Sequence, residues 1–253
     1  MPKLRPLFWP TLMMLPIFLF ALSLGVWQVE RRAWKRDLLD RIATSQAAPP
    51  MPFDELVKGD PLRREYGKVA VSGTFLHDRE FYLAARSLNR NVGFHVVTPF
   101  RLDNGDVVLI NRGWIPETWR NPVPRRAEGQ IAGRTEVTGV LRLAQRKGTF
   151  QLDNEPARNF WFYYDLGAMR SWAGLAPGRE IANLDRFVLE ADATPNPGGS
   201  PRGGQTRIDI PNDHLQYALT WFSFVVALLV IYLVYHHQAG RLVLGGGKRP
   251  PPA

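Results

Sequence analysis

Two long apolar runs without charged residues stand near the two ends of the chain. Residues 7–28 and residues 215–235 contain no Asp, Glu, Lys or Arg. Each run is about the 20 residues that a helix needs to cross roughly 30 Å of hydrocarbon. The pattern predicts two transmembrane helices. A cleaved signal peptide is the alternative for the first, but the run exceeds the usual 7–15 residues and no small-residue cleavage site precedes Glu30.

The hydrophobic pattern changes twice between these runs. Residues 29–48 are charged and rich in helix formers, and Pro49 and Pro50 follow them. A juxtamembrane helix should therefore continue the first span and end before the prolines. From Tyr66 onward, apolar residues instead recur with a period of two, which is typical of strands.

The middle of the chain predicts a series of short strands. Asn104-Gly105 between two apolar runs predicts a hairpin. Asp165 is a candidate cap for a short helix over 165–172, and the Pro- and Gly-rich residues 193–207 predict a loop. The expected strands are 68–75, 80–85, 93–102, 106–114, 135–143 and 186–190. The fold class is an α+β membrane protein in which two transmembrane helices flank one mainly antiparallel β domain, residues 49–214, built as a barrel or a sandwich.

The net charge of +9 is concentrated beside the predicted spans. The tails 1–6 and 236–253 are short and basic, whereas the middle of the chain is nearly balanced. Short basic flanks face the cytoplasm, so both tails are expected there and the β domain outside. A nucleic-acid partner is not expected, because it would require the excess charge on the folded domain. The absence of cysteine excludes disulfides and thiolate metal sites.

Motifs for familiar catalytic chemistry are missing. The sequence has no Gly-x-Ser-x-Gly, His-Glu-x-x-His, Walker or dinucleotide-binding motif. The glycine-rich stretch 198–205 has no strand–helix context and is expected to be a loop. A membrane-anchored enzyme therefore ranks below a binding or assembly protein, although an active site assembled from distant residues stays open.

His214 differs from the other four histidines. His77 is expected to stabilise a turn, His95 to be packed or exposed in a strand, and His236 and His237 to contact lipid headgroups. His214 opens the second span and shares a helical face with Tyr217 and Trp221, at i, i+3 and i+7. It is either a metal ligand or a polar residue beside an interfacial aromatic belt.

The two spans should bring a second group of residues to the depth of His214. If each helix crosses once, Trp27, Gln28 and Arg31 reach the same surface, followed by Trp34. An apolar, arginine-flanked site with one imidazole suits a haem, whose iron takes an axial histidine and whose carboxylates pair with arginine. Trp27 and Trp221 as simple membrane anchors remain the alternative.

Ordered motifs along nearly the whole chain resemble the Surfeit locus protein 1 family. No single motif is decisive, but their order is specific. The motifs are Leu24-Gly25-Val26-Trp27-Gln28, Arg31-Arg32, Trp34-Lys35, Gly73-x-Phe75-x-His77, Val97-Thr98-Pro99-Phe100, Asn111-Arg112-Gly113-Trp114-Ile115-Pro116, Gly129-Gln130, Asn154, Trp161 with Tyr164-Asp165, Gly203-Gly204-Gln205-Thr206-Arg207, and Asn212-x-His214-Leu215-Gln216-Tyr217 with Thr220-Trp221.

The resemblance implies a cytochrome c oxidase assembly factor with no catalysed reaction. It places the protein in the bacterial plasma membrane or mitochondrial inner membrane, with the β domain extracytoplasmic. It also implies haem a as cofactor, His214 as its iron ligand and oxidase subunit I as partner, with haem a synthase as a second candidate partner. The expected cofactor-binding residues are His214, Tyr217, Trp221, Trp27, Gln28, Arg31, Arg32 and Arg207. A cofactor-free membrane scaffold for oxidase subunits is the alternative.

Overall fold

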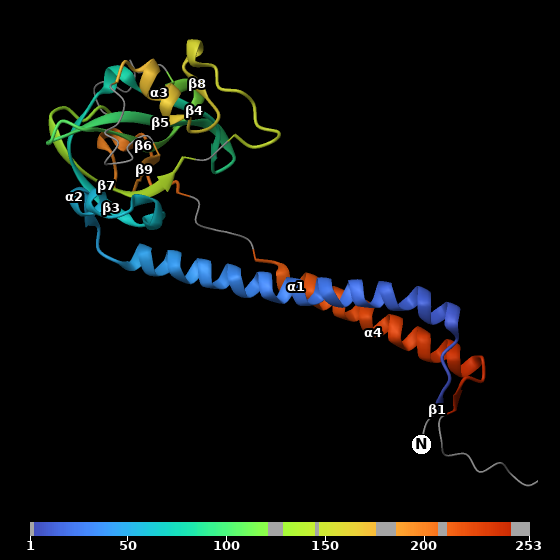
Figure 1. Ribbon diagram of the computed structural model, residues 1–253. Helices are drawn as coiled ribbons and strands as arrows, with labels where there is room; N and C mark the ends of the chain where they lie inside the picture. Colours follow the sequence, from blue (N-terminus) through green and yellow to red (C-terminus); the bar gives the residue numbers. More distant parts are fainter. Residues whose placement is uncertain (1–2, 121–128, 145–146, 176–185, 207–211, 244–253) are drawn as a thin grey trace, which may run out of the picture. The chain divides into compact units, whose positions relative to one another are not determined.

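The computed structural model describes residues 3–120, 129–144, 147–175, 186–206 and 212–243 (Figure 1). The chain divides into two compact units. One combines Met1–Asp40 with Asp209–Ala253, and the other is Arg41–Ile208. The first unit is helical and joins the two ends of the chain, and the second is built on a β-sheet.

Two long helices form the helical unit. Helix α1 covers Phe8–Ala47, with Pro16 inside it, and α4 covers His214–Gln238. Both are long and apolar enough to span a membrane, with mean hydropathy of 2.0 and 2.3 in their most apolar windows. The predicted span 7–28 and the juxtamembrane helix 29–48 are thus one continuous helix. Beyond the helices, β1 (Lys3–Leu4) pairs with β10 (Leu242–Val243) in an antiparallel ladder.

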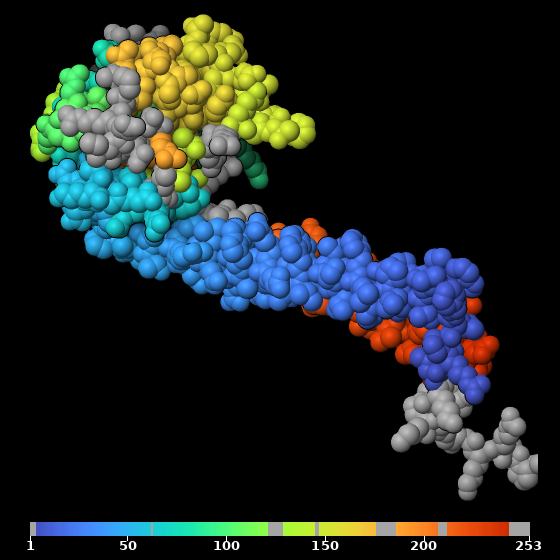
Figure 2. All heavy atoms as spheres, viewed as in Figure 1, coloured from blue at the N-terminus to red at the C-terminus, as the bar shows by residue number. Residues whose placement is uncertain are grey.

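Small residues let α1 and α4 approach closely. A Cβ atom placed on Gly25 of α1 would lie only 2.7 Å from the Phe222 ring of α4, so a larger residue would displace that ring. Ala21 of α1 and Ala218 of α4 are buried. Close packing through small residues is the usual basis of helix pairing in membranes. Figure 2 shows the spheres of α4 lying directly along those of α1.

His236 links the far end of α4 to the beginning of α1. Its Nε2 accepts a hydrogen bond from the backbone N–H of Leu7 at 3.0 Å, and its Nδ1 donates to the carbonyl of Tyr232 at 2.8 Å. The side chain is fully buried. Headgroup contact is therefore the wrong interpretation of His236, which instead satisfies a backbone donor at the start of α1. His237, by contrast, is exposed.

The β unit contains one strongly curled, mainly antiparallel sheet. Its order is β2-β3-β7-β9-β6-β5-β4-β8, and β3 also pairs with β5 over three residues. Among the described residues, the parallel pairs are β2–β3, β4–β8 and β6–β9, each over two residues. The strands are β2 (Met51–Pro52), β3 (Lys68–Phe75), β4 (Phe81–Leu88), β5 (Asn91–Leu102), β6 (Val107–Pro116), β7 (Arg134–Leu143), β8 (Phe160–Trp161) and β9 (Phe187–Ala191).

The curled sheet confirms the predicted fold class. The β3–β5 pairing joins only one end of these strands, so the sheet folds over itself in two layers and does not close along its length. Two short helices cover it. Helix α2 (Phe53–Lys58) buries Phe53 and Leu56 in one core cluster, and α3 (Leu166–Trp172) buries Leu166 and Met169 in another.

Most sequence-predicted elements of the sheet are present. The turn before β6 contains Gly105 with φ 87°, as a tight hairpin requires. Strand β6 is central and nearly all buried, as its apolar run predicts. The Asp165 side chain caps α3 by accepting a hydrogen bond from the Ala168 N–H. The sequence pattern did not predict α2 or the two-residue strands.

Candidate functional site

His214 is the first residue of α4 and lies against α1. Its Nδ1 is 2.6 Å from the side-chain oxygen of Gln28. Because that oxygen can only accept, the imidazole donates its Nδ1–H. The proton on Nδ1 leaves a lone pair on Nε2 of the neutral ring. Second-shell hydrogen bonds of this kind fix the tautomer and orientation of metal-binding histidines.

The helix packing explains why these two side chains meet. Gln28 follows Gly25 by three residues on α1, so it continues the face that packs against α4. His214 precedes the buried Ala218 by four residues and continues the facing surface of α4. The close approach at Gly25 therefore sets the separation of the polar pair one turn further along.

Trp27 forms one side of the histidine environment. Its ring centroid is 6.3 Å from that of His214, and the two ring planes meet at 85°. The indole is half exposed. Trp27 and Gln28 thus come from consecutive positions of α1 and contact the imidazole from two directions. This part of the predicted site is assembled in the structure.

Of the two predicted aromatic site residues of α4, Trp221 packs against α1 and Tyr217 is exposed. Trp221 packs edge-to-face on Phe20 of α1, with ring centroids 6.4 Å apart. The Tyr217 side chain is 57% exposed and is therefore not buried between α1 and α4. An apolar groove of about 340 Å³ runs beside Trp221. Its lining residues are Ile17, Phe20, Ala21, Trp221, Phe224, Ala227, Leu228 and Ile231.

The two described arginines of the predicted site, Arg31 and Arg32, lie within about one turn of Gln28. Arg31 is exposed, and its guanidinium stacks 4.0 Å from the centroid of the Trp34 ring. Arg32 is half-buried and follows Gln28 by four residues, so it lies on the same face of α1 about one turn, or roughly 6 Å, further along. Arg207 lies outside the described residues. Arg31 follows Gln28 by three residues and also lies near this face, but its guanidinium stacks on Trp34, a contact that Arg32 does not share.

The residues around His214 would fit a haem better than a bare metal ion. Within the described ranges, no group of three or more His, Asp or Glu side chains could hold a metal ion, and the chain has no cysteine. A single imidazole cannot fill the coordination sphere of an ion. A porphyrin supplies four nitrogen ligands itself, so one histidine, an apolar surface and a nearby cation match its needs.

A buried charged network in the β domain has a structural role. Arg112 is 1% exposed, and its Nη1 lies 3.5 Å from the Glu80 carboxylate. The same guanidinium donates to the Gly129 carbonyl and to Asn196 at 3.1 Å. His77 adds a contact to Glu80 at 3.2 Å and one to the Ile131 carbonyl at 3.0 Å. These bonds tie three loops to the sheet, and His77 stabilises a turn as predicted.

The fold and the site define a class of protein. Its members have two candidate membrane helices, a β domain encoded between these helices in the sequence, and a histidine at the contact between the two helices. Residues 15–226 match the model of the SURF1 family. The chain is 36% identical to Surfeit locus protein 1 of Homo sapiens, over 85% of this chain and 73% of that protein. It is 35% identical to a SURF1-like protein of Monosiga brevicollis, over 97% of this chain and 93% of that protein. The chain belongs to the SURF1 family, which confirms the resemblance seen in the sequence.

Proposed function

We propose that this chain is a cytochrome c oxidase assembly factor that holds haem a at His214 and assists its insertion into oxidase subunit I. Membership in the SURF1 family supports the assembly role. The haem role rests on one observation. Gln28 accepts the Nδ1–H of His214, which leaves the Nε2 lone pair for an iron.

The surrounding residues would meet the other requirements of a haem, which are an aromatic surface, a cation and space for the isoprenoid tail. Trp27 offers an aromatic surface next to the imidazole, and Arg32, one turn from Gln28, would be the cation for a propionate. The apolar groove beside Trp221 would accept an isoprenoid tail, which haem a carries. When bound, the haem iron would offer a coordination site to His214. The protein residues bind the group, orient it and keep it at the bilayer.

A transient carrier needs a site that both binds and releases. Trp27 and Tyr217 are half exposed, so the imidazole is not enclosed by the helix pair. One protein ligand gives weaker attachment than two. An open, singly ligated site is consistent with transfer to an acceptor rather than permanent retention.

The proposed location follows from the helices and the charges. Helices α1 and α4 would cross the plasma (inner) membrane, with the basic tails in the cytoplasm and the β domain in the periplasm. His214 and Gln28 would then lie near the outer membrane surface. The proposed partners are oxidase subunit I, haem a synthase as the source of the group, and the lipid bilayer.

A cofactor-free scaffold for oxidase subunits is the second candidate function. The tight contact between Gly25 and Phe222 favours it, because the same helix pairing would suit a purely structural anchor. In that case, the half-exposed Tyr217 would be part of a surface for another membrane helix.

Co-expression with the enzymes of haem a synthesis tests the two functions against each other. The full chain would be purified in mild detergent and its absorption spectrum and haem content measured. A haem carrier should retain haem a with the spectrum of a histidine-ligated iron. Protein that copurifies with oxidase subunits but carries no haem would support the scaffold.

A further inference from the structure

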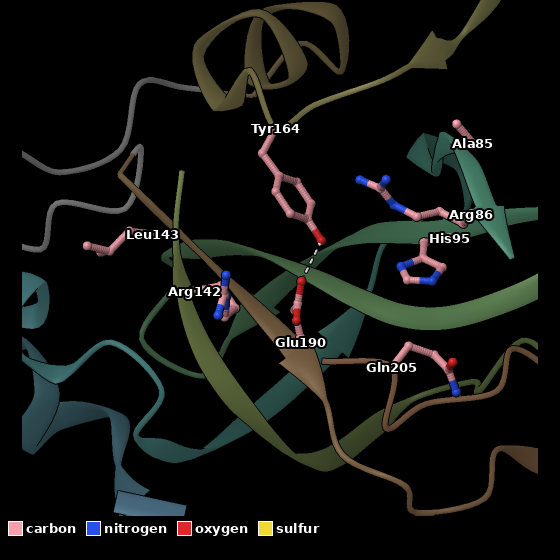
Figure 3. A pocket seen from close by; sticks show the side chains of 8 residues that line it. All are labelled: Ala85, Arg86, His95, Arg142, Leu143, Tyr164, Glu190 and Gln205. Carbon is pink, nitrogen blue, oxygen red and sulfur yellow. Dashed lines mark hydrogen bonds between the residues drawn. The ribbon is translucent and has the colours of Figure 1, made fainter. Parts of the chain in front are cut away.

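The β domain contains a polar cavity that the proposed haem site does not use. Its volume is about 290 Å³, close to the lower end of small-molecule sites. Figure 3 shows its lining, which consists of Ala85, Arg86, His95, Arg142, Leu143, Tyr164, Glu190 and Gln205. All these residues belong to the β unit.

A chain of hydrogen bonds that includes Asn111 links three lining residues of this cavity, His95, Tyr164 and Glu190. Asn111 is buried, and its Nδ2 donates to the Tyr164 hydroxyl at 2.8 Å and to Nδ1 of His95 at 3.0 Å. The Tyr164 hydroxyl in turn donates to Glu190 at 3.0 Å (Figure 3). The amide orientation is fixed because the Asn111 oxygen accepts from the Gly113 N–H.

Strand register brings these groups together. Asn111 of β6 and Glu190 of β9 are direct partners in the parallel pair. Val140 of β7 is the antiparallel partner of Glu190, so Arg142, two residues on, points to the same face of the sheet. The sheet itself therefore places an acid, an amide and a guanidinium on one surface.

Backbone strain directs a second guanidinium into the cavity. The β4–β5 register shifts between Leu83 and Arg86, and Ala85 at this bulge has φ 55°. A left-handed conformation is strained for a residue with a side chain, and such strain is concentrated at functional sites. Bulges commonly re-aim a side chain beside such sites. Here the bulge precedes Arg86, whose guanidinium extends toward Tyr164 (Figure 3).

Arg142 has unused hydrogen-bonding capacity. Nη1 of Arg142 is buried and has no hydrogen-bond partner within the part of the chain that the structure describes. Its Nε lies 3.9 Å from Glu65, beyond hydrogen-bond distance, and its guanidinium stacks on Tyr66. A buried donor without a partner is costly, which indicates that something else satisfies it.

The charges lining the cavity select the kind of ligand. Arg86 and Arg142 contribute two positive charges and Glu190 contributes one negative charge. The lining therefore has an excess of one positive charge. A carboxylate carries one charge and accepts forked hydrogen bonds from guanidinium groups. A phosphate dianion would add charge beside Glu190. Glu190 also provides an acceptor for a donor group next to the carboxylate.

We propose that this cavity binds a carboxylate that carries an adjacent N–H or O–H donor, with Arg86 and Arg142 holding the carboxylate and Glu190 accepting from the donor. The carboxylate can come from a free small molecule or from the C-terminus of a protein partner. Both sources present the same chemistry, and probes of different size distinguish them.

N-acetylglycine is a minimal probe because it carries a carboxylate next to an amide N–H. Binding to the purified full chain would be measured by calorimetry, with N-acetylglycinamide and inorganic phosphate as comparisons. We expect N-acetylglycine to bind and the uncharged amide not to bind. We expect Arg86→Gln and Arg142→Gln each to weaken binding at least about tenfold, as loss of a charged hydrogen bond does. Arg134→Gln at the exposed start of β7 is the matched control and should bind like the wild type.

Other results of the same experiment would contradict the carboxylate proposal or identify the source of the ligand. Equal or tighter binding of phosphate would overturn the carboxylate assignment. No binding of N-acetylglycine at millimolar concentration by the folded wild type, or unchanged binding by folded Arg86→Gln, would mean a water-filled cavity only. An acetylated tripeptide with a free C-terminus that binds at least tenfold tighter than N-acetylglycine would identify a protein partner. Equal binding would identify a small molecule. Thermal unfolding of each variant establishes that it is folded.

Discussion

The Nδ1 atom of His214 lies 2.6 Å from the side-chain oxygen of Gln28, although 186 residues separate the two in sequence. This contact joins the end of the apolar part of α1 to the first turn of α4. It determines which ring nitrogen carries the proton and which carries the lone pair. The candidate haem site is therefore built from two residues rather than from a lone histidine.

Replacing Gln28 should weaken haem binding without removing the ligand. Gln28→Leu keeps the volume but lacks the oxygen that accepts the Nδ1–H. We expect haem affinity to fall about 10- to 100-fold, as it does when second-shell partners of metal ligands are lost. Gln28→Glu retains an acceptor oxygen and should keep more haem than the leucine variant. Haem titration of the two purified proteins measures the difference, and equal affinity would remove Gln28 from the site.

Enlarging Gly25 should separate the helices. A side chain there meets the Phe222 ring, so Gly25→Leu should lower the stability of the helix pair by about 1–3 kcal/mol, as overpacking does. Thermal unfolding in detergent would show the loss, and Phe222→Ala should partly restore stability. Ala33→Leu at an exposed position of α1 is the control. A wild-type melting temperature for Gly25→Leu would contradict the observed packing.

Removing one member of the Arg112–Glu80 pair should destabilise the β domain. Both side chains are almost fully buried, at 1% and 3% exposed. Arg112→Met leaves the Glu80 carboxylate without its main countercharge, and we expect a loss of about 3–5 kcal/mol, as for other broken buried pairs. Denaturant unfolding followed by tryptophan fluorescence measures it. Arg112→Met combined with Glu80→Gln should recover part of the loss, and additive effects of the two changes would argue against the pair.

The stability of the β domain should fall at alkaline pH because of Tyr164. Burial raises the pKa of its hydroxyl well above the usual value of 10.0, and the Glu190 carboxylate raises it further. The folded state therefore keeps a proton that the unfolded chain loses. This stabilisation is fully present below pH 10.0 and is lost as pH rises toward the folded pKa. Denaturant unfolding between about pH 8 and pH 11 should show a steeper decline for the wild type than for Tyr164→Phe. Parallel curves would contradict this explanation.

The sequence predicted the elements better than it predicted their contacts. Apolar runs fixed the helices around residues 7–28 and 215–235, and alternation with Asn104-Gly105 fixed the hairpin before β6, because these signals are local. The bond between His214 and Gln28 depends on how α1 and α4 pack, which Gly25 controls. Periodicity alone grouped Tyr217 with His214, but the helix pairing leaves Tyr217 half exposed.

The cavity of the β domain was beyond prediction for a similar reason. It depends on the parallel register of β6 and β9, which places Asn111 beside Glu190. It also depends on a bulge at Ala85, where the sequence has no Gly, Asn or Asp that would predict a left-handed residue. The one local signal was Asn111 itself, a polar residue directly after the apolar run Val107–Ile110. A buried amide in that position requires hydrogen-bond partners, here His95 and Tyr164.

The absorption spectrum of His214→Ala tests the proposed function most directly. The variant and wild type would be co-expressed with haem a synthesis, purified as full chains, and compared for haem content and spectrum. His237→Ala, at the exposed far end of α4, is the matched control. We expect His214→Ala to lose most of its haem and any remaining spectrum to shift, while His237→Ala matches the wild type. Unchanged haem content and spectrum in folded His214→Ala would show that His214 is not the ligand.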